Sequence, residues 1–387
     1  MNRIAIKGWC PGAHHPMQSG DGLIVRIRPR GGRLSAAQAL AIADLATRHG
    51  NGRIDLSGRA NLQLRGVREE THGPLLAELA CLGLVDADAD VEAQRNILVS
   101  PLWREGDDTQ TIAAELERAL GEGRLGLPAK FGFAVDCGAE RALALAPADI
   151  RFERGAGGGL VVRADGASYG RSVPRAGAVT LAVELTRWFL ASGGASDGRG
   201  RMSAHLGQGA RLPDGLAGHM LPAGALPRPS PGVCAPGALV GLAFGQMPSA
   251  MLKFLAARAA GLRMTPWRMV LVEGLRDMPQ HDGLITRADD PLLRVIACTG
   301  APGCEQAHAR TRALARTLAP HIPADARLHV SGCTKGCAHP GASAITIVAT
   351  ADGFDLVRDG SARDAPVLRG LTPARILADP AAILGGR

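Results

Sequence analysis

Four cysteines toward the C-terminal end of the chain have a spacing that predicts metal chemistry. They occur in two short segments, ACTGAPGCEQAH and HVSGCTKGCAHP, so a C-x5-C pair precedes a C-x3-C pair. The set comprises Cys298, Cys304, Cys333 and Cys337. Structural zinc sites favour about two to four residues between paired cysteines, which the wider first interval fits poorly. A [4Fe–4S] cluster needs four thiolates around a larger cube, so it is the favoured prediction and zinc the weaker alternative.

Glycines accompany the cysteines in both segments. They stand at positions 300, 303, 332 and 336. A residue without a side chain lets the backbone come close to inorganic sulfide and donate hydrogen bonds to it. These glycines therefore strengthen the prediction of a cluster.

Composition limits the class of protein and of ligand. The chain has 387 residues, 46% of them hydrophobic and only 3% aromatic, and a net charge of +8 from 44 Lys and Arg against 36 Asp and Glu. The length and composition predict a folded protein of two or three domains, and the charge favours an acidic ligand or partner without identifying it. No basic run or aromatic-basic interleaving supports nucleic-acid binding. No apolar run of about 20 residues predicts a membrane span, so we expect a cytoplasmic protein whose eight cysteines stay reduced.

Two segments of the chain repeat the same order of elements. Residues 21–67 and 236–275 each begin with an apolar run and a turn, continue with a helix pattern and end with two short strand patterns. Without gaps, Ser57 aligns with Thr265 and Gly66 with Gly274. Ser35 and Gln38 predict a capping box on the first helix, and Gly50 and Gly261 predict left-handed caps at the two helix ends. The repeat predicts two copies of one half-domain.

The last strands of the two copies differ in the side chains that one face presents. In the first copy polar residues alternate with Leu62 and Leu64, which at a strand period of two puts them on one face. These residues are Arg59, Asn61, Gln63 and Arg65. The second copy has Trp267, Met269, Leu271 and Glu273 instead. We predict an anion-binding face in the first copy and a packing surface in the second; a merely solvated strand face is the alternative.

The pattern along the chain predicts an α+β protein of four segments. Residues 1–86 and 225–288 are the repeats, expected to pair as one domain, and residues 87–224 and 289–387 are two α/β domains. In the first α/β domain we expect helices near 109–120 and 179–190 and strands near 130–135 and 160–163. A Pro-rich linker is expected at 221–237, and a hairpin with Asp352 and Gly353 at its turn near the C-terminus. Cys81 and Cys137 are expected to be buried small residues.

The cysteine spacing and the duplicated unit resemble the nitrite and sulfite reductase family. Further stretches look like segments in which that family places basic residues around a tetrapyrrole and a bound anion; they are GLIVRIRPRGG, SGRANLQLRG, QRNILVSP and LPAKFGF. The resemblance implies a duplicated ferredoxin-like fold, a [4Fe–4S] cluster on the four cysteines and anion contacts from Arg26 or Arg28, Arg59, Arg95 and Lys130. We group these with Asn61, Gln63 and Arg65 as the predicted substrate-binding set.

Three departures from the reductases indicate different chemistry. The second lysine of the reductase motif is Gly132 here, Thr334 and Lys335 replace Pro and Asn between the last two cysteines, and the opening KGWCPGAHHPMQSGDGL is distinctive. A six-electron reduction consumes many protons, so losing a cationic proton donor should impair it. The GCTKGCAHP stretch and the CPG-containing start resemble the precorrin-3B synthase branch of the family.

That branch implies an oxidoreductase which hydroxylates C20 of precorrin-3A and forms a γ-lactone with oxygen from O2, using the cluster and one mononuclear non-haem iron. GAGGGL at 155–160 fits a turn better than a dinucleotide site, so an external reductase using NADH is the expected donor. Iron ligands cannot be assigned from spacing; the candidates are His14, His15, His205, His308, His329 and His339. The alternatives are a siroheme-dependent nitrite or sulfite reductase and a non-catalytic electron-transfer or tetrapyrrole-binding protein.

Overall fold

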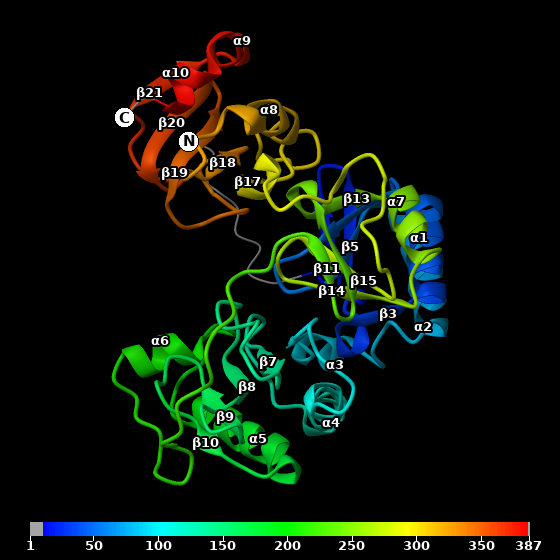
Figure 1. The fold of residues 1–387 in the computed structure, drawn as a ribbon, viewed down its shortest axis with the longest axis vertical. Coiled ribbons are helices and arrows are strands. Elements are labelled where there is room, and N and C mark those ends of the chain that lie inside the picture. The colour runs from blue at the N-terminus through cyan, green and yellow to red at the C-terminus, as the bar shows by residue number, and fades with distance from the viewer. Residues whose placement is uncertain (1–10, 386–387) are drawn as a thin grey trace.

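The computed structural model describes residues 11–385, which form four β-sheets with helices packed on them (Figure 1). The two repeats form the middle of the molecule. One α/β unit lies on either side of them, with the cysteine-bearing unit at the top of Figure 1 and residues 87–224 at the bottom. The mixed α/β architecture with a duplicated half-domain is the predicted fold class.

The two central sheets exchange a strand. The first has the order β1 (Met17–Ser19), β2 (Gly22–Ile27), β5 (Leu62–Val67), β4 (Arg53–Leu56), β13 (Gln246–Pro248). The second has the order β11 (Gly232–Cys234), β12 (Gly237–Leu242), β15 (Met269–Glu273), β14 (Gly261–Met264), β3 (Arg33–Ser35), with β16 (Leu284–Ile285) beside β12. Each repeat thus donates the strand before its helix to the edge of the other sheet, so the repeats interlock.

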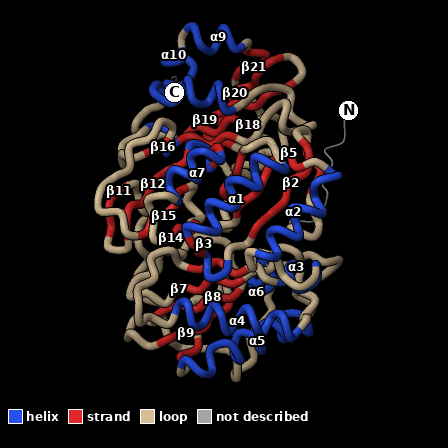
Figure 2. The backbone as a smooth tube through the Cα atoms, turned by 90° about the vertical axis from the view of Figure 1, so that its right-hand side faces the viewer, coloured by secondary structure: helices blue, strands red, loops and turns tan. Residues whose placement is uncertain are grey.

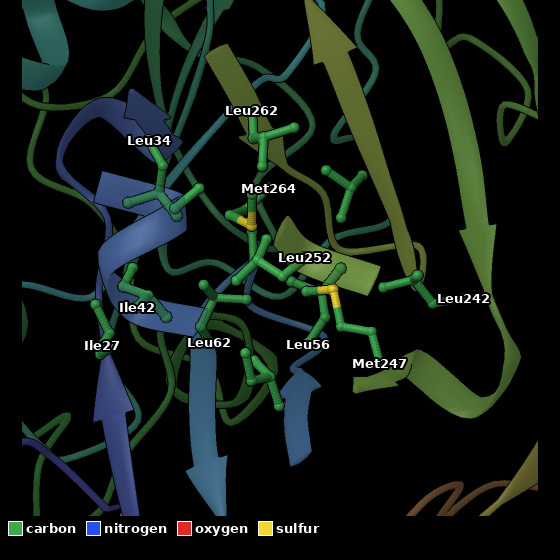
Figure 3. Packing of buried hydrophobic residues seen from close by; sticks show 14 of the residues in the cluster. Ile27, Leu34, Ile42, Leu56, Leu62, Leu242, Met247, Leu252, Leu262 and Met264 are labelled. Carbon is green, nitrogen blue, oxygen red and sulfur yellow. The ribbon is translucent and has the colours of Figure 1, made fainter. Parts of the chain in front are cut away.

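The two repeat helices lie side by side over these sheets and close the central core. They are α1 (Ala36–His49) and α7 (Ser249–Ala256), and α2 (Glu69–Cys81) packs against α1 (Figure 2). Apolar side chains from both repeats interdigitate beneath them (Figure 3). Leu62 and Leu64 are fully buried there, so the polar residues that alternate with them face the other way. Burying such a leucine stabilises the fold by about 2 kcal/mol.

Backbone conformation confirms that the repeats are equivalent. Ala60 and Arg268 occupy matching positions and both have a left-handed φ, of 56° and 61°. The capping box of Ser35 and Gln38 is present as predicted. Arg59 and Ala60 lie in a turn that the Ser57 hydroxyl holds by accepting the Asn61 N–H at 3.1 Å, so the strand begins at Leu62 and Arg59 is not part of it.

Three local predictions were wrong. Gly50 ends α1 with an extended φ of −126°, and Gly261 lies within β14, so neither is a left-handed cap. Both positions need glycine for close approach instead, because a Cβ on Gly50 would meet the Arg65 carbonyl and one on Gly261 would meet Arg33 and Glu273. Cys81, the last residue of α2, is exposed, whereas Cys137 is buried as expected.

The two flanking units have the same strand order. One sheet runs β6 (Ile97–Val99), β7 (Phe133–Asp136), β8 (Ile150–Arg154), β9 (Leu160–Ala164), β10 (Arg171–Ser172). The other runs β17 (Val295–Ala297), β18 (Leu328–Ser331), β19 (Ser343–Thr350), β20 (Gly353–Gly360), β21 (Leu368–Leu371). In each, the first three strands are parallel and the last two antiparallel.

Helices cover these flanking sheets close to where the sequence predicts them. The first unit has α3 (Ala89–Gln94), α4 (Thr109–Gly123), α5 (Arg175–Ala191) and α6 (Met202–Gly207), and the second has α8 (Arg312–Leu318), α9 (Pro373–Ala378) and α10 (Pro380–Gly385). Short 3-10 turns occupy Arg30–Gly32, Ala243–Gly245, Pro291–Arg294 and Ala319–His321. The Pro-rich linker contains a strand, because β11 within it pairs with β12. None of the described helices is both long and apolar enough to cross a membrane.

Candidate functional site

A cavity of about 520 Å³ opens where the first repeat meets both flanking units. This volume falls within the range of small-molecule sites. Three parts of the fold supply its walls: the β1–β2 hairpin of the first repeat, two loops of the first flanking unit, and the two cysteine loops of the other. The residues that line it include Met17, Ser19, Ile24, Lys130, Arg199, Arg201, Cys304, Cys333, Lys335 and Cys337.

The cysteine loops follow neighbouring parallel strands. Cys298 comes directly after β17, and Cys333 follows β18 by two residues. Since the carboxyl ends of parallel strands meet at one edge of a sheet, the two loops converge there. Cys304, Cys333 and Cys337 line the cavity, and the Cys298 sulfur accepts the Gly332 N–H at 3.1 Å. The structure therefore brings three of the four predicted cysteines to the cavity wall and places the loop of Cys298 beside them.

Burial changes the acidity of two of these thiols. It raises the pKa of Cys333 and of Cys337 above the ordinary thiol value. A free thiolate is therefore disfavoured at both positions, whereas a bound cationic centre would stabilise it.

The cysteine loops do not form a site for a single metal ion. Among residues 11–385, no group of three or more His, Cys, Asp or Glu is close enough to hold one metal ion. The corners of a cubane lie farther apart than the ligands of one ion, so this finding leaves a cluster open. Gly332 packs close to the loops, since a Cβ there would be 3.3 Å from the Cys298 sulfur and 2.8 Å from the Ala307 Cβ.

A buried aspartate fastens the opposite wall. Asp149 is fully buried and its carboxylate accepts from the Gly132 N–H at 2.9 Å, the Arg201 Nε at 2.9 Å and the Met202 N–H at 2.8 Å. These bonds join the segment that carries Lys130 to the hairpin that carries Arg199. Charge-assisted hydrogen bonds of this kind are among the strongest in proteins. Asp149 therefore holds together the two loops that carry Lys130 and Arg199.

Arg59 braces the same wall from the first repeat. Its Nη2 donates to the Lys130 carbonyl at 2.7 Å, and together with Asn61 it lines a separate small recess of about 10 Å³. There is no room for a side chain at Gly132. A Cβ at this position would be 2.9 Å from the Asn96 carbonyl oxygen and 3.1 Å from Arg59 Nη1.

Two predicted anion contacts are already paired with carboxylates. Arg28 donates to Glu92 at 2.6 Å, and Arg95 donates to Asp86 at 2.9 Å and to the Arg28 carbonyl at 3.0 Å. Both arginines are about 95% buried, and burial lowers the pKa of Arg28 to about 10. Neither lines the cavity.

The Arg28–Glu92 pair fixes the start of the described chain. The Glu92 carboxylate accepts the backbone N–H groups of Ala13 and His14 at 2.7 and 3.0 Å. His14 and His72 add ring bonds to the carbonyls of Asp86 and Ala13. The distinctive opening segment is thus held by carboxylates, as far as it lies within the described residues; Cys10 lies outside them.

The remaining predicted residues follow the polar face of the first sheet. Arg26 and Gln63 are cross-strand partners, and the Gln63 amide, in the orientation that satisfies both groups, accepts from Arg26 at 2.8 Å. Arg65 is buried and contacts Asp21 and the carbonyl of Gly303. Of the eight residues in the predicted substrate-binding set, Lys130 alone lines the large cavity.

Sequence reasoning missed the cations of the glycine-rich hairpin. Arg199 and Arg201 reach the cavity from a turn in which Asp197 and Gly198 both have positive φ. The signal was the segment SDGRGR, in which arginines alternate with glycines. Lys335, which departs from the reductase motif, also lines the cavity.

The histidines proposed as iron ligands are scattered. His14 bonds the Asp86 carbonyl, and His205 bonds Ser192 in the first flanking unit. His329 is fully buried, and neither of its ring nitrogens has a hydrogen-bond partner among the described residues. Its ring lies 5.8 Å from that of His339, and burial lowers its pKa to about 4. No two-histidine, one-carboxylate set forms within residues 11–385.

The fold resembles that of a solved structure. The chain resembles the NirA protein of Mycobacterium tuberculosis with a TM-score of 0.64 and 18% identity, over 93% of this chain and 79% of that one. Residues 15–81 match the nitrite/sulfite reductase ferredoxin-like half domain.

Sequence relatives extend this likeness. A ferredoxin–nitrite reductase of Synechococcus elongatus is 31% identical, but over only 33% of this chain and 27% of that protein. A precorrin-3B synthase of Sinorhizobium sp. is 30% identical over 93% of this chain and 84% of that protein. On this nearly full-length match, the chain belongs to the precorrin-3B synthase family and is an oxidoreductase.

Proposed function

We propose that this chain catalyses the oxygen-dependent conversion of precorrin-3A to precorrin-3B, by C20 hydroxylation with γ-lactone formation, in aerobic cobalamin biosynthesis. The single observation that carries the proposal is that the cysteine loops and a set of cations line one cavity. The full-length similarity to a precorrin-3B synthase supports it.

In the proposal, Cys298, Cys304, Cys333 and Cys337 hold a [4Fe–4S] cluster at the cavity wall. When bound, such a cluster supplies single electrons, which an external reductase using NADH would replenish. The thiols give up their protons on binding it, so their raised pKa values make cluster retention weaken at low pH. The reaction would take place in the cytoplasm, where thiols stay reduced.

The chain's own residues would orient the substrate. Precorrins carry several carboxylates, and a buried carboxylate needs a charged partner. Lys130, Arg199 and Lys335 are the cavity cations suited to this task, and Met17 and Ile24 offer apolar contact to the macrocycle. Arg59 would act indirectly, by bracing Lys130.

The buried arginines would likewise act through the chain. Arg28 and Arg95 are matched by Glu92 and Asp86, so a substrate carboxylate would have to displace an existing partner. We assign them to positioning the opening segment and the loop before β6. Arg26, Asn61 and Gln63 extend the polar face beside the cavity and remain proposed contacts for its rim.

No donor set for a mononuclear iron is present among the described residues. The buried His329 comes closest, but its neighbour His339 already bonds the Ala342 carbonyl. No step of the proposal therefore passes through such an iron.

A siroheme-dependent reductase is less favoured by the cavity. The reductases place a lysine where this chain has Gly132, and a Cβ there would lie 2.9 Å from the Asn96 carbonyl oxygen. The wall would have to shift to accept the longer residue. Proton delivery by a lysine at this point is therefore not available.

The test is turnover with labelled oxygen. Protein purified without air is mixed with precorrin-3A, a reductant and ¹⁸O₂, and the product mass is measured. We expect one labelled oxygen atom in the product and none when labelled water replaces labelled gas. An unchanged substrate mass with tight binding would instead establish a tetrapyrrole-binding protein without turnover.

Absorbance separates the remaining alternative. A cluster alone gives a broad shoulder near the violet, whereas siroheme adds strong Soret and red bands. We expect the shoulder alone. Siroheme bands in purified protein, together with nitrite or sulfite reduction, would replace this proposal with a reductase.

A further inference from the structure

Arg65 makes a set of contacts that no substrate role explains. It is 96% buried, and its guanidinium donates to the Asp21 carboxylate at 2.6 and 3.0 Å and to the Ser19 hydroxyl at 3.1 Å. A weaker ion pair of 3.6 Å joins it to Asp55. Its charge is therefore matched within the first repeat.

The remaining bond of Arg65 crosses to the cysteine-bearing unit. Its Nη2 donates to the Gly303 carbonyl at 2.9 Å, and the Ser19 hydroxyl donates to the same oxygen at 2.7 Å. Gly303 immediately precedes Cys304. The carbonyl beside this cysteine thus receives two hydrogen bonds from the first repeat.

Steric contact restricts the same loop. A Cβ on Gly20 would collide with the Pro302 carbonyl and lie 3.3 Å from the Cys304 backbone nitrogen. The β1–β2 turn therefore packs directly on the loop. Hydrogen bonds and packing together leave Cys304 little freedom to move away from the cavity.

The second repeat has an equivalent arginine–carboxylate pair in which the positions of the two charges are exchanged. Arg263 and Glu273 occupy the positions of Asp55 and Arg65, and they form an ion pair of 2.6 Å. Arg263 donates to the carbonyls of Pro101 and Trp103 in the other flanking unit at 3.0 and 2.7 Å. Each repeat therefore grips the loop that follows the first parallel strand of one unit.

We propose that Arg65, oriented by Asp21, is a positioning residue that holds the Cys304 loop in the arrangement that binds the cluster, and that it is not a substrate contact. The proposal rests on the cluster assigned under the proposed function. Outer-shell groups of this kind hold ligands in place and typically change metal affinity by roughly 10- to 100-fold when removed.

The test compares Arg65→Gln, Arg65→Lys and, as the matched control, Arg263→Gln. Proteins are purified without air and assayed for iron and sulfide, for the electron paramagnetic resonance spectrum after reduction, and for the rate of bleaching in air. We expect Arg65→Gln to bleach roughly tenfold faster and to show an altered spectrum. Arg65→Lys should recover part of the loss, because lysine keeps the charge but not the fork geometry.

Arg263→Gln should lower thermal stability while leaving the spectrum and bleaching rate unchanged. Equal cluster loss in Arg65→Gln and Arg263→Gln would overturn the proposal, because it would show a general loss of stability. A wild-type spectrum and bleaching rate in Arg65→Gln would also overturn it.

A second measurement works without a cluster. In protein freed of iron, we expect Arg65→Gln to speed alkylation of Cys304 severalfold relative to Cys333, as read by peptide mass. Wild-type protein that never holds iron would defeat the proposed function, but the alkylation result would still decide whether Arg65 restrains the loop. Unchanged Cys304 alkylation would contradict the restraint.

Discussion

The two flanking units share one scaffold but put different side chains at its functional edge. In both, the residue after the first parallel strand donates its N–H to the second strand: Ser100 to the Val135 carbonyl at 2.8 Å, and Cys298 to the Val330 carbonyl at 3.3 Å. Ser100 therefore occupies the place of Cys298. The strand order fixes where the loops meet, and the loop residues decide whether they bind a cluster.

The same comparison extends to the outer wall of the cavity. In the first unit Asp149 precedes β8 and grips the loops of Lys130 and Arg201, whereas the equivalent residue of the other unit is Ala344. One unit thus supplies a hydrogen-bonded cationic wall and the other supplies thiols. The cavity needs both because neither unit closes it alone.

Removing a cysteine from the cluster edge should have the largest effect. Cys333→Ser is expected to abolish the violet absorbance and most bound iron, because a hydroxyl is a poor iron ligand at neutral pH. The matched control is Cys137→Ala, which removes the buried thiol at the corresponding edge of the other unit. Iron and sulfide are measured in both. If Cys333→Ser retained its iron as Cys137→Ala does, neither thiol would be needed to bind iron, and the cluster assignment would be wrong.

Loosening the cationic wall should weaken substrate binding without affecting iron. Asp149→Asn removes the charge that holds Arg201 and Gly132, and we expect precorrin-3A affinity to fall roughly tenfold, equal to about 1.4 kcal/mol. The control Asp165→Asn breaks another arginine pair in the same unit, with Arg151. Affinity is measured by titration of the substrate spectrum. Loss of iron in Asp149→Asn would contradict the prediction, because it would show that the cationic wall also affects iron binding at the cysteine loops.

Single cavity lysines should have smaller effects that differ between the walls. Lys130→Gln and Lys335→Gln are each expected to weaken precorrin-3A binding by roughly fivefold at low salt. The effect should be smaller at high salt, because ion pairs between these lysines and substrate carboxylates would be partly exposed to solvent. Lys335 stands between two of the cysteines. Only its substitution should also lower the midpoint potential of the cluster, as measured by redox titration. Equal potentials in both variants would place Lys335 outside the cluster's field.

The sequence predicted the scaffold well because its signals are local. Hydrophobic alternation placed Leu62 and Leu64 in the core, and the capping box placed the start of α1. The strand exchange of β3 and β13 was not predictable, because it depends on pairing between segments far apart in the chain.

The same distinction applies to the candidate site. The cysteine spacing identified the loops that meet at the cavity, since it reflects local chain geometry. The basic residues were less certain, because charge alone does not show whether an arginine meets a ligand or a carboxylate such as Glu92. The Arg199 hairpin reaches the cavity only through tertiary packing.

The last prediction concerns stability alone, at the edge of the first unit that corresponds to the cysteine-bearing edge of the other. Burial raises the pKa of Asp136 to about 6, despite hydrogen bonds from the Leu143 N–H and Ser100. The unfolded carboxyl titrates near its ordinary value of about 4. Above pH 6 the folded state therefore carries a disfavoured charge, and this cost disappears as the pH falls from 6 to 4.

Asp136→Asn should remove that cost and raise the free energy of unfolding by about 2 kcal/mol at pH 8. The gain should shrink through pH 6 and vanish near pH 4, while iron content stays unchanged. Thermal unfolding of variant and wild type across this range measures it, with the exposed pair variant Asp289→Asn as a pH-insensitive control above pH 5. A gain that did not depend on pH would mean that the charge of the Asp136 carboxylate is not what lowers the stability of this edge. The difference between the two units would then lie in packing and not in charge.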